Sequence, residues 1–281
     1  MNHLLRSHAP ISDAGWSMLD EEARQRLTPA LAARKLVDFS GPHGWEYSAT
    51  NLGRTTPVTA APCDGVSGLQ RRVLPLVEVR ADFELSRLEL RDADRGAEDA
   101  DLEALDRAAH QMAVAENIAV FHGWHGVLSG IEETTPHDKL ELGDDTDLYA
   151  RQVATAVERL LRNGITGPYG LALGREEYRL VAETAEHGGY PLFDHLARIL
   201  GGPIVWAPGV EGAVVVSLRG GDFLFESGQD LSIGYDSHDA SLVRLYLEES
   251  FSFHVATPEA AVVLTAKPAV VAARRRPRAG R

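Results

Sequence analysis

Residues Gly220 to Val255 read GGDFLFESGQDLSIGYDSHDASLVRLYLEESFSFHV, and the second half of this stretch alternates apolar and polar side chains. A period of two over so many residues predicts a β-strand with one face in a hydrophobic core. Only Glu249 breaks the apolar face. The apolar face comprises Val243, Leu245, Leu247, Phe251, Phe253 and Val255, and the opposite face Arg244, Tyr246, Glu248, Ser250, Ser252 and His254. A strand from Val243 to Val255 would span roughly 43 Å, which favours an extended subunit built to contact neighbours.

The composition describes a globular protein with an acidic body. The chain has 281 residues, 44% of them hydrophobic and 25% charged, and a formal net charge of −13. This length can bury a large core in one or two domains. The negative charge argues against a body that wraps nucleic acid. The end of the chain differs, because Lys267 to Arg281 hold six basic residues and no acid, and we expect this tail to be disordered.

Several features favour a cytoplasmic protein. The single cysteine, Cys63, cannot form an intrachain disulfide. The N-terminal MNHLLRSHAP lacks the apolar core of a signal peptide. No run of about 18 apolar residues predicts a membrane span.

The remaining patterns predict an α+β fold. Apolar stripes with helical spacing, and the caps and glycine stops around them, predict helices over 13–27, 101–121, 147–162, 175–184 and 191–200. Strands are expected over 73–90, 166–174, 203–208 and 212–223. Residues 48–72 are rich in Thr, Pro, Gly and Ser and predict an extended loop or a loose hairpin, placed as an arm on a neighbouring subunit.

The histidines do not form a convincing metal site. His122 and His125 give an H-x-x-H pair without the H-E-x-x-H spacing, so a histidine pair at a helix end is favoured over a ligand pair. His187 and His195 flank a Gly-Gly-Tyr-Pro turn with acids nearby. In a monomer this turn is a solvated loop, whereas around a symmetry axis its acids and histidines would line a pore.

No nucleophile or phosphate-binding motif is present either. Cys63 has no histidine partner in the sequence, and the serines lack a G-x-S-x-G elbow. Arg34 and Asp38 are four residues apart and predict an ion pair on one helical turn. The chain therefore favours a structural protein or a binding scaffold without catalytic residues, metal or cofactor.

Several stretches occur in the order found in one known family. They are APISDAGWSMLDEEAR, ARKLVDFSGPHGWEY, FELSRLELRDADRG, EDADLEALDRAAHQMAVAENIAVFHG, NGITGPYGLALG, HGGYPL, IVWAP and the opening stretch from RGGDF onward. Over residues 1 to about 264 the chain thus resembles the encapsulins, the linocin M18-like shell proteins of family 1.

The resemblance implies the HK97 phage-capsid fold, with a peripheral domain, an axial domain and an extended arm called the E-loop. The implied divisions are an N-terminal lumenal helix and the start of the peripheral domain at 1–47, the E-loop at 48–75, the peripheral domain with its spine helix at 76–133, the axial domain at 134–222, returning peripheral strands at 223–265, and the basic tail at 266–281.

The resemblance also implies a function. Subunits would assemble, sixty to a T=1 icosahedral shell, around a cargo enzyme such as a ferritin-like iron oxidase or a dye-decolorising peroxidase. Iron storage or defence against oxidative stress would follow. A C-terminal targeting peptide of the cargo would dock in an apolar groove. The residues implied in docking are Arg34, Leu36, Asp38, Phe39, Leu231, Ile233 and Tyr235.

The loop around 183–191 matches the lining of the five-fold pore in the family. The residues implied are Glu183, Glu186, His187, Gly188, Gly189 and Tyr190. They would pass small ions such as Fe²⁺, with a charge that changes when histidine titrates. No membrane and no specific nucleic acid are expected as partners. Two alternatives stay open, a protease or bacteriocin activity and a phage major capsid protein.

Overall fold

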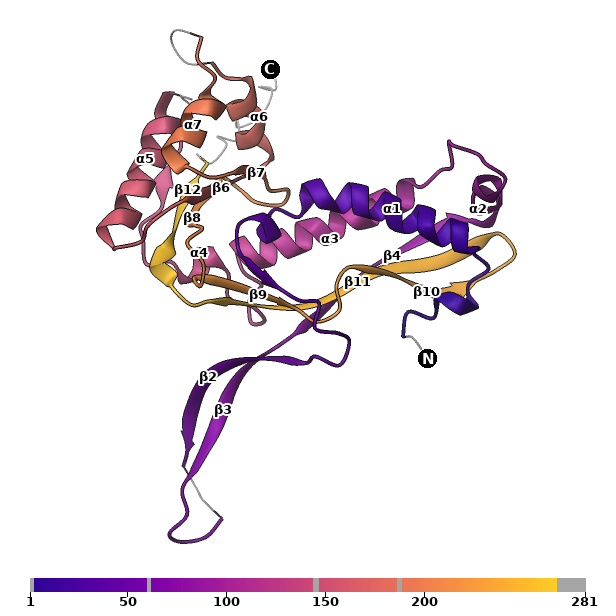
Figure 1. Ribbon diagram of the computed structural model, residues 1–281, viewed down its shortest axis with the longest axis horizontal. Coiled ribbons are helices and arrows are strands. Elements are labelled where there is room, and N and C mark those ends of the chain that lie inside the picture. The colour runs from indigo at the N-terminus through magenta and orange to yellow at the C-terminus, as the bar shows by residue number, and fades with distance from the viewer. Residues whose placement is uncertain (1–2, 60–61, 144–146, 186–188, 267–281) are drawn as a thin grey trace, which may run out of the picture.

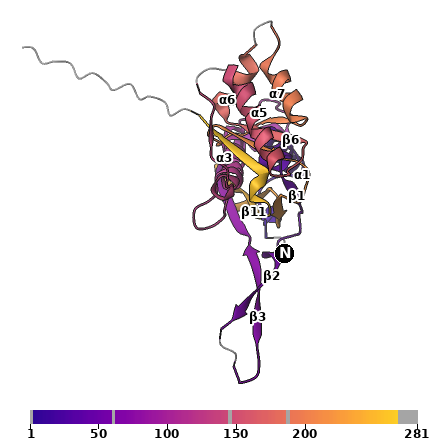
Figure 2. The ribbon, with the colours of Figure 1, turned by 90° about the vertical axis from the view of Figure 1, so that its left-hand side faces the viewer.

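The chain forms an elongated body from which one long hairpin projects (Figure 1). The computed structural model describes residues 3–59, 62–143, 147–185 and 189–266. Viewed after a 90° turn about the vertical axis, the body is narrow (Figure 2). Among the described helices, none is both long and apolar enough to cross a bilayer.

The long strand expected from the opening stretch is confirmed as β11, Leu242–Val255. It is the centre of a five-stranded sheet with β4 (Val77–Ser86), β10 (Ser232–His238), β9 (Phe223–Ser227) and β1 (Asp38–Ser40). β4 pairs antiparallel with β11 from Leu242 to Phe251. On the other edge of β11, β10 pairs with its first half and β9 with its last five residues. The apolar face is buried except at Val255, which is half-buried, and Glu249 is buried with it. The opposite face is not fully exposed as expected, since Tyr246, Ser250 and Ser252 are buried too.

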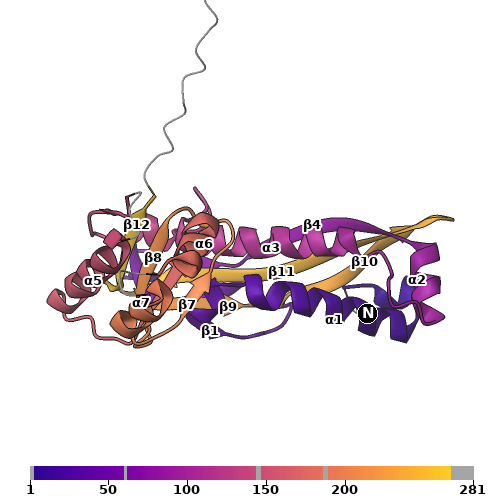
Figure 3. The same ribbon diagram turned by 90° about the horizontal axis from the view of Figure 1, so that it is seen from above.

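Two long helices lie along this sheet, α1 (Asp13–Ala30) and α3 (Glu103–Phe121). Seen from above, they run beside each other over β4, β10 and β11 (Figure 3). The hydroxyl of Ser12 caps α1 by accepting from the Gly15 amide at 2.9 Å. Apolar residues of both helices and of the three strands form one hydrophobic cluster. α1 extends beyond the expected end to include Pro29, which sits in the last turn.

A second sheet and its helices form the other end of the body. Its strand order is β5-β12-β8-β6-β7. The bounds are β5 Leu140–Glu141, β6 Tyr169–Leu173, β7 Ile204–Trp206, β8 Ala213–Ser217 and β12 Ala261–Thr265. The helices are α4 Ile131–Thr134, α5 Asp147–Arg162, α6 Arg175–Glu183 and α7 Leu192–Leu200. Three short 3₁₀ turns cover Arg6–His8, Ala33–Lys35 and Pro258–Ala260.

The segment expected as a loop or loose hairpin is a regular two-stranded ribbon. β2 (Ala49–Val58) pairs antiparallel with β3 (Gly68–Pro75), with one irregularity between Asn51 and Arg54. The ribbon points away from both sheets (Figure 1). Most of its residues are exposed, including Val58, Leu69 and Val73.

The strand expected over residues 73–90 is wrong at both ends, because residues 73–75 belong to β3 and β4 begins only at Val77. β4 stops at Ser86 and a helix, α2 (Arg87–Asp94), follows. The Ser86 hydroxyl accepts from the Leu88 and Glu89 amides at 3.2 and 3.5 Å. Leu88 and Leu90 are two residues apart, as in a strand, but only Leu90 is buried. The Ser86 cap favours a helix here in spite of that spacing.

Candidate functional site

A groove lies between α1 and the turn that leads into β10. Its volume is about 380 Å³. The floor is apolar and both walls carry charged groups. The lining residues are Asp20, Ala23, Arg24, Leu27, Thr28 and Leu31 on the helical side, and Arg34, Asp230, Leu231, Ser232, Ile233 and Leu247 on the other.

The sequence builds this groove in two ways. Ala23 and Leu27 belong to the apolar stripe of α1, and this stripe packs against the sheet. β10 is the last strand in its sheet order, so its outer edge faces the groove. Leu231 and Ile233 are two residues apart and contribute their side chains to the same wall.

An N-terminal segment, residues 3–9, covers the rest of the β10 edge. The Leu4 carbonyl accepts from the Tyr235 amide at 2.9 Å, and Arg6 Nε donates to the Ile233 carbonyl at 2.8 Å. Arg6 also pairs with Asp20 of α1 and lies over the Trp16 ring, 4.4 Å from its centroid. One end of the groove is thereby closed by an ion pair.

Arg34 stands at the other end of the groove and contacts three carboxylates. Its Nε lies 2.7 Å from Glu116 of α3, its Nη1 2.6 Å from Asp230, and its Nη2 2.7 Å from Glu249 of β11. The expected Arg34–Asp38 pair is wrong, because the guanidinium turns inward to partners far away in sequence. Glu116 and Glu249 are 0% and 1% exposed, whereas the Asp230 side chain is 39% exposed. We call these four residues the Arg34 cluster.

Burial and charge shift the ionisation of this cluster. Burial lowers the pKa of Arg34, but the three carboxylates more than offset it, so the pKa is raised and the guanidinium is charged. Burial raises the pKa of Glu249 well above its ordinary value, and the charge of Glu116 raises it further against the opposing effect of Arg34. Burial also raises the pKa of Glu116, with Arg34 opposing.

The structure brings three of the seven expected docking residues into the groove lining, Arg34, Leu231 and Ile233. Tyr235 is buried behind it, with its hydroxyl 2.5 Å from His238 Nδ1. The remaining three, Leu36, Asp38 and Phe39, do not line the groove.

These three residues have other contacts. Leu36 is 2% exposed in the core of the second sheet. Asp38 of β1 accepts from the Gly221 amide at 2.7 Å. The Phe39 ring lies under the Arg34 guanidinium at 4.9 Å and stacks on Phe225 at 5.5 Å. Their docking roles stay predictions.

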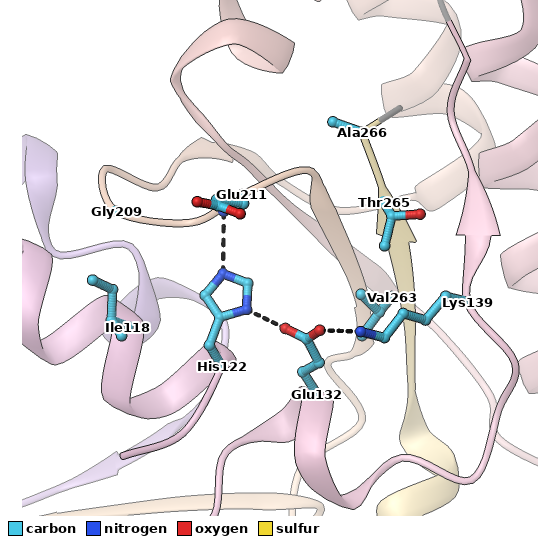
Figure 4. Close-up of a pocket in the computed structure, with 9 residues that line it drawn as sticks. All are labelled: Ile118, His122, Glu132, Lys139, Gly209, Glu211, Val263, Thr265 and Ala266. Atoms are coloured by element: carbon cyan, nitrogen blue, oxygen red, sulfur yellow. Dashed lines mark hydrogen bonds and ion pairs between the residues drawn. The ribbon is translucent and has the colours of Figure 1, made fainter. Parts of the chain in front are cut away.

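A larger cavity of about 690 Å³ lies between the end of α3 and β12 (Figure 4). His122 receives a hydrogen bond on Nε2 from the Glu211 amide at 3.1 Å, and its Nδ1 contacts Glu132. Lys139 contacts the same carboxylate. Glu132 is thus neutralised by its neighbours. Within the described part of the chain, no three His, Cys, Asp or Glu side chains are placed to hold a metal ion.

The expected pore residues are only partly described. Glu183 ends α6 and accepts from Arg179 Nη1 at 2.8 Å, and Tyr190 lies 5.2 Å from the Arg198 guanidinium. Gly189 has a φ of +80°, which an L side chain rarely adopts. Glu186, His187 and Gly188 lie outside the described residues. The basic tail lies outside them as well, apart from Ala266.

Comparison with known proteins shows the family to which the chain belongs. The model of the Linocin_M18 family, described as an encapsulating protein for peroxidase, matches residues 1–252. The chain belongs to the encapsulin family. A type 1 encapsulin shell protein of Rhodospirillum rubrum is 46% identical over 270 residues, covering 94% of this chain and 96% of the relative. The type 1 encapsulin shell protein of Mycobacterium tuberculosis is 39% identical, covering 94% of this chain and all of the relative.

Solved structures agree on the fold. The virus-like particle from Pyrococcus furiosus aligns with a TM-score of 0.64 at 18% identity, covering 90% of this chain and 98% of the other. Mycobacterium phage Ogopogo aligns with a TM-score of 0.53 at 16% identity, covering 85% and 92%. The expected HK97-type capsid fold is therefore confirmed for this encapsulin. Its relatives are named as shell proteins, not as enzymes, and it is a shell subunit of a capsid-like particle.

Sequence reasoning missed nine of the twelve groove-lining residues and the two buried acids of the Arg34 cluster, and Glu116 and Asp20 show why. Glu116 lies within the apolar pattern of α3, and its partner Arg34 is 82 residues away. Asp20 appears as one of several acids on the surface of α1. Glu249 was the available signal, because a carboxyl group on an otherwise apolar strand face needs either a buried cation or a proton.

Proposed function

We propose that this shell protein encloses a cargo enzyme whose terminal peptide docks in the groove between α1 and β10. The observation that carries the proposal is the groove itself, an apolar trough open to an extended chain and bounded by charged residues at both ends. Aliphatic side chains of the peptide would pack against Leu27, Leu231 and Leu247, which line the groove. Asp20 and Asp230 would orient the polar parts of the peptide.

The family description supports a peroxidase as the cargo class. A ferritin-like iron oxidase is the second class, and the functions served are defence against oxidative stress or iron storage. The cargo holds the chemistry in either case, and the shell supplies enclosure and positioning.

Assembly is proposed to give a closed shell of sixty subunits in the cytoplasm, with the domain divisions given above. The hairpin β2–β3 would pair with a neighbouring subunit, because its backbone edges and apolar side chains are exposed in the isolated chain. The loop between α6 and α7 would surround a symmetry axis and pass small ions.

The docking proposal is tested by filling the groove. Thr28 is exposed on α1 and lines the groove, so Thr28→Trp occupies the trough without entering the core. Gln25→Trp is the matched control, since Gln25 is exposed on the same helix but does not line the groove. Shells purified from the native host are compared by mass spectrometry of the enclosed proteins. We expect Thr28→Trp to lose the cargo and Gln25→Trp to keep it.

Two results would overturn this picture. Undiminished cargo in Thr28→Trp shells would place docking elsewhere. Compact monomers without particles in electron micrographs of the unmodified protein would contradict a closed shell.

A further inference from the structure

The Arg34 cluster holds more negative than positive charge, and two of its three acids, Glu116 and Glu249, are shielded from water. One guanidinium faces the carboxyl groups of Glu116, Asp230 and Glu249 at 2.6 to 2.7 Å. These four groups come from the Ala33–Lys35 turn, α3, the turn before β10, and β11. With all three carboxyls ionised, the cluster would carry a net negative charge, and two of its carboxylates would be fully buried. Such a charge costs several kcal/mol unless it is neutralised.

Two buried oxygen atoms without a hydrogen-bond partner, one on Glu116 and one on Glu249, indicate where the excess negative charge is neutralised. Glu116 and Glu249 each direct Oε2 at Arg34, and the Oε1 of each is buried and accepts no hydrogen bond. The two carboxyl groups contact the same guanidinium and act on each other, since the charge of Glu116 raises the pKa of Glu249. Two ionised carboxylates would leave both buried Oε1 atoms without a donor, whereas one proton held between the two carboxyl groups supplies a donor.

We propose that Glu116 and Glu249 share one buried proton, and that Arg34 transmits the loss of this proton to Asp230 on the groove wall. With the proton in place, the cluster is one guanidinium, one shared negative charge and Asp230, and every buried oxygen has a partner. The arrangement resembles the carboxyl dyads in which two close acids cannot both ionise.

Loss of the proton changes the contacts of Arg34. The two buried carboxylates then attract the guanidinium more strongly than Asp230 does, because water screens the partly exposed Asp230. Asp230 is the only one of the three acids that can turn to solvent. Its Oδ1 also accepts from the Leu231 amide at 2.8 Å, so its departure loosens the wall that carries Leu231. The consequence for cargo docking rests on the proposed function, but the proton itself does not.

The direction of the pH effect follows from the raised pKa of Glu249. The unfolded chain releases this proton at the ordinary glutamate pKa, whereas the folded chain keeps it to higher pH. Stability from the shared proton is therefore complete in acid and is lost as pH rises through the folded-state pKa.

Infrared spectroscopy of assembled shells tests the proton directly. A protonated carboxyl group has its own C=O stretch, and the difference between the wild-type and Glu249→Gln spectra at neutral pH isolates the band of this pair. We expect Glu249→Gln to lose the band, because the amide donates to Glu116 in place of the shared proton. Glu103→Gln is the control, an exposed glutamate on the same helix as Glu116, and it should keep the band.

Hydrogen exchange tests the link to the groove without any cargo. At alkaline pH the wild-type Leu231 amide should exchange faster than in Glu249→Gln, and at acidic pH the two proteins should agree. The wild-type melting temperature should also fall from neutral to alkaline pH more than that of Glu249→Gln.

Three outcomes would overturn the proposal. The neutral-pH band could be the same in wild type, Glu249→Gln and Glu116→Gln, which would place the protonated carboxyl elsewhere. The wild type could show no protonated carboxyl at all. The Leu231 amide could exchange at the same rate in wild type and variant at every pH. Arg34 would then not transmit the loss of the proton to the groove wall. If Glu249→Gln does not fold, the same three measurements are made on Glu116→Gln, which removes the other carboxyl group of the pair.

Discussion

At the scale of single residues, Arg34 joins parts of the chain that are far apart in sequence. Its partners are 82, 196 and 215 positions away, in α3, the turn before β10, and β11. The aromatic rings of Phe39 and Phe225 also lie beneath the guanidinium. This one side chain therefore links the turn after α1 to α3 and to the central strand β11.

Replacing Arg34 by alanine should be strongly destabilising. The change leaves Glu116 and Glu249 buried without a cation, a loss of about 3–5 kcal/mol in the free energy of unfolding. Urea unfolding of dissociated subunits measures it. Arg24→Ala is the control, because Arg24 is 68% exposed and pairs only with the neighbouring Glu21, so about 0–1 kcal/mol is expected. Equal unfolding midpoints for the two variants would contradict a structural role for the cluster.

At the scale of elements, the hairpin β2–β3 is incomplete by itself. A two-stranded ribbon is only marginally stable in water, and this one presents Leu69 and Val73 on an exposed face. The strands of the body, in contrast, all have at least one partner in a five-stranded sheet.

Leu69→Asp should leave the subunit folded and weaken its assembly. Leu69 is 68% exposed in the subunit, so its replacement removes no core contact. Gln70→Asp introduces the same charge next to it, on the other face of the hairpin. Size-exclusion chromatography should find fewer particles for Leu69→Asp than for Gln70→Asp. A particle fraction that is equal in the two variants would exclude this face of the hairpin from the subunit contact.

Element prediction from sequence succeeded where a period was long and failed where a cap decided the structure. Thirteen alternating positions sufficed for β11, and the apolar stripe sufficed for α3. The short run from Arg87 to Leu90 alternates by chance, and only the Ser86 cap turns it into a helix. The groove could not be predicted, because it forms where α1 lies beside β10 and no local sequence pattern encodes that contact. The Arg34–Asp38 prediction failed for the same reason.

At the scale of the whole molecule, the charge of the chain opposes assembly. Each copy carries a formal net charge of −13, and closing a shell brings many copies together. Self-repulsion of like-charged subunits is screened by salt over roughly 10 Å at 0.1 M. The contacts between subunits have to exceed this repulsion.

Raising the ionic strength should therefore stabilise assembled shells against dissociation. Sedimentation velocity over a salt series at constant protein concentration measures the fraction in particles. Dissociation that increases with salt would show that ion pairs between subunits outweigh the overall repulsion.

The contact between residues 3–9 and β10 also determines when the chain can finish folding during synthesis. Arg6 leaves the ribosome early, and its acceptor Ile233 follows 227 residues later. The hydrophobic cluster around α1 and α3 likewise needs strand residues up to Leu247. A nascent or truncated chain that stops before this point keeps Trp16 and Leu19 uncovered, so chaperones and proteases can distinguish it from a complete subunit. A chain must therefore be complete through Leu247 before this cluster can close.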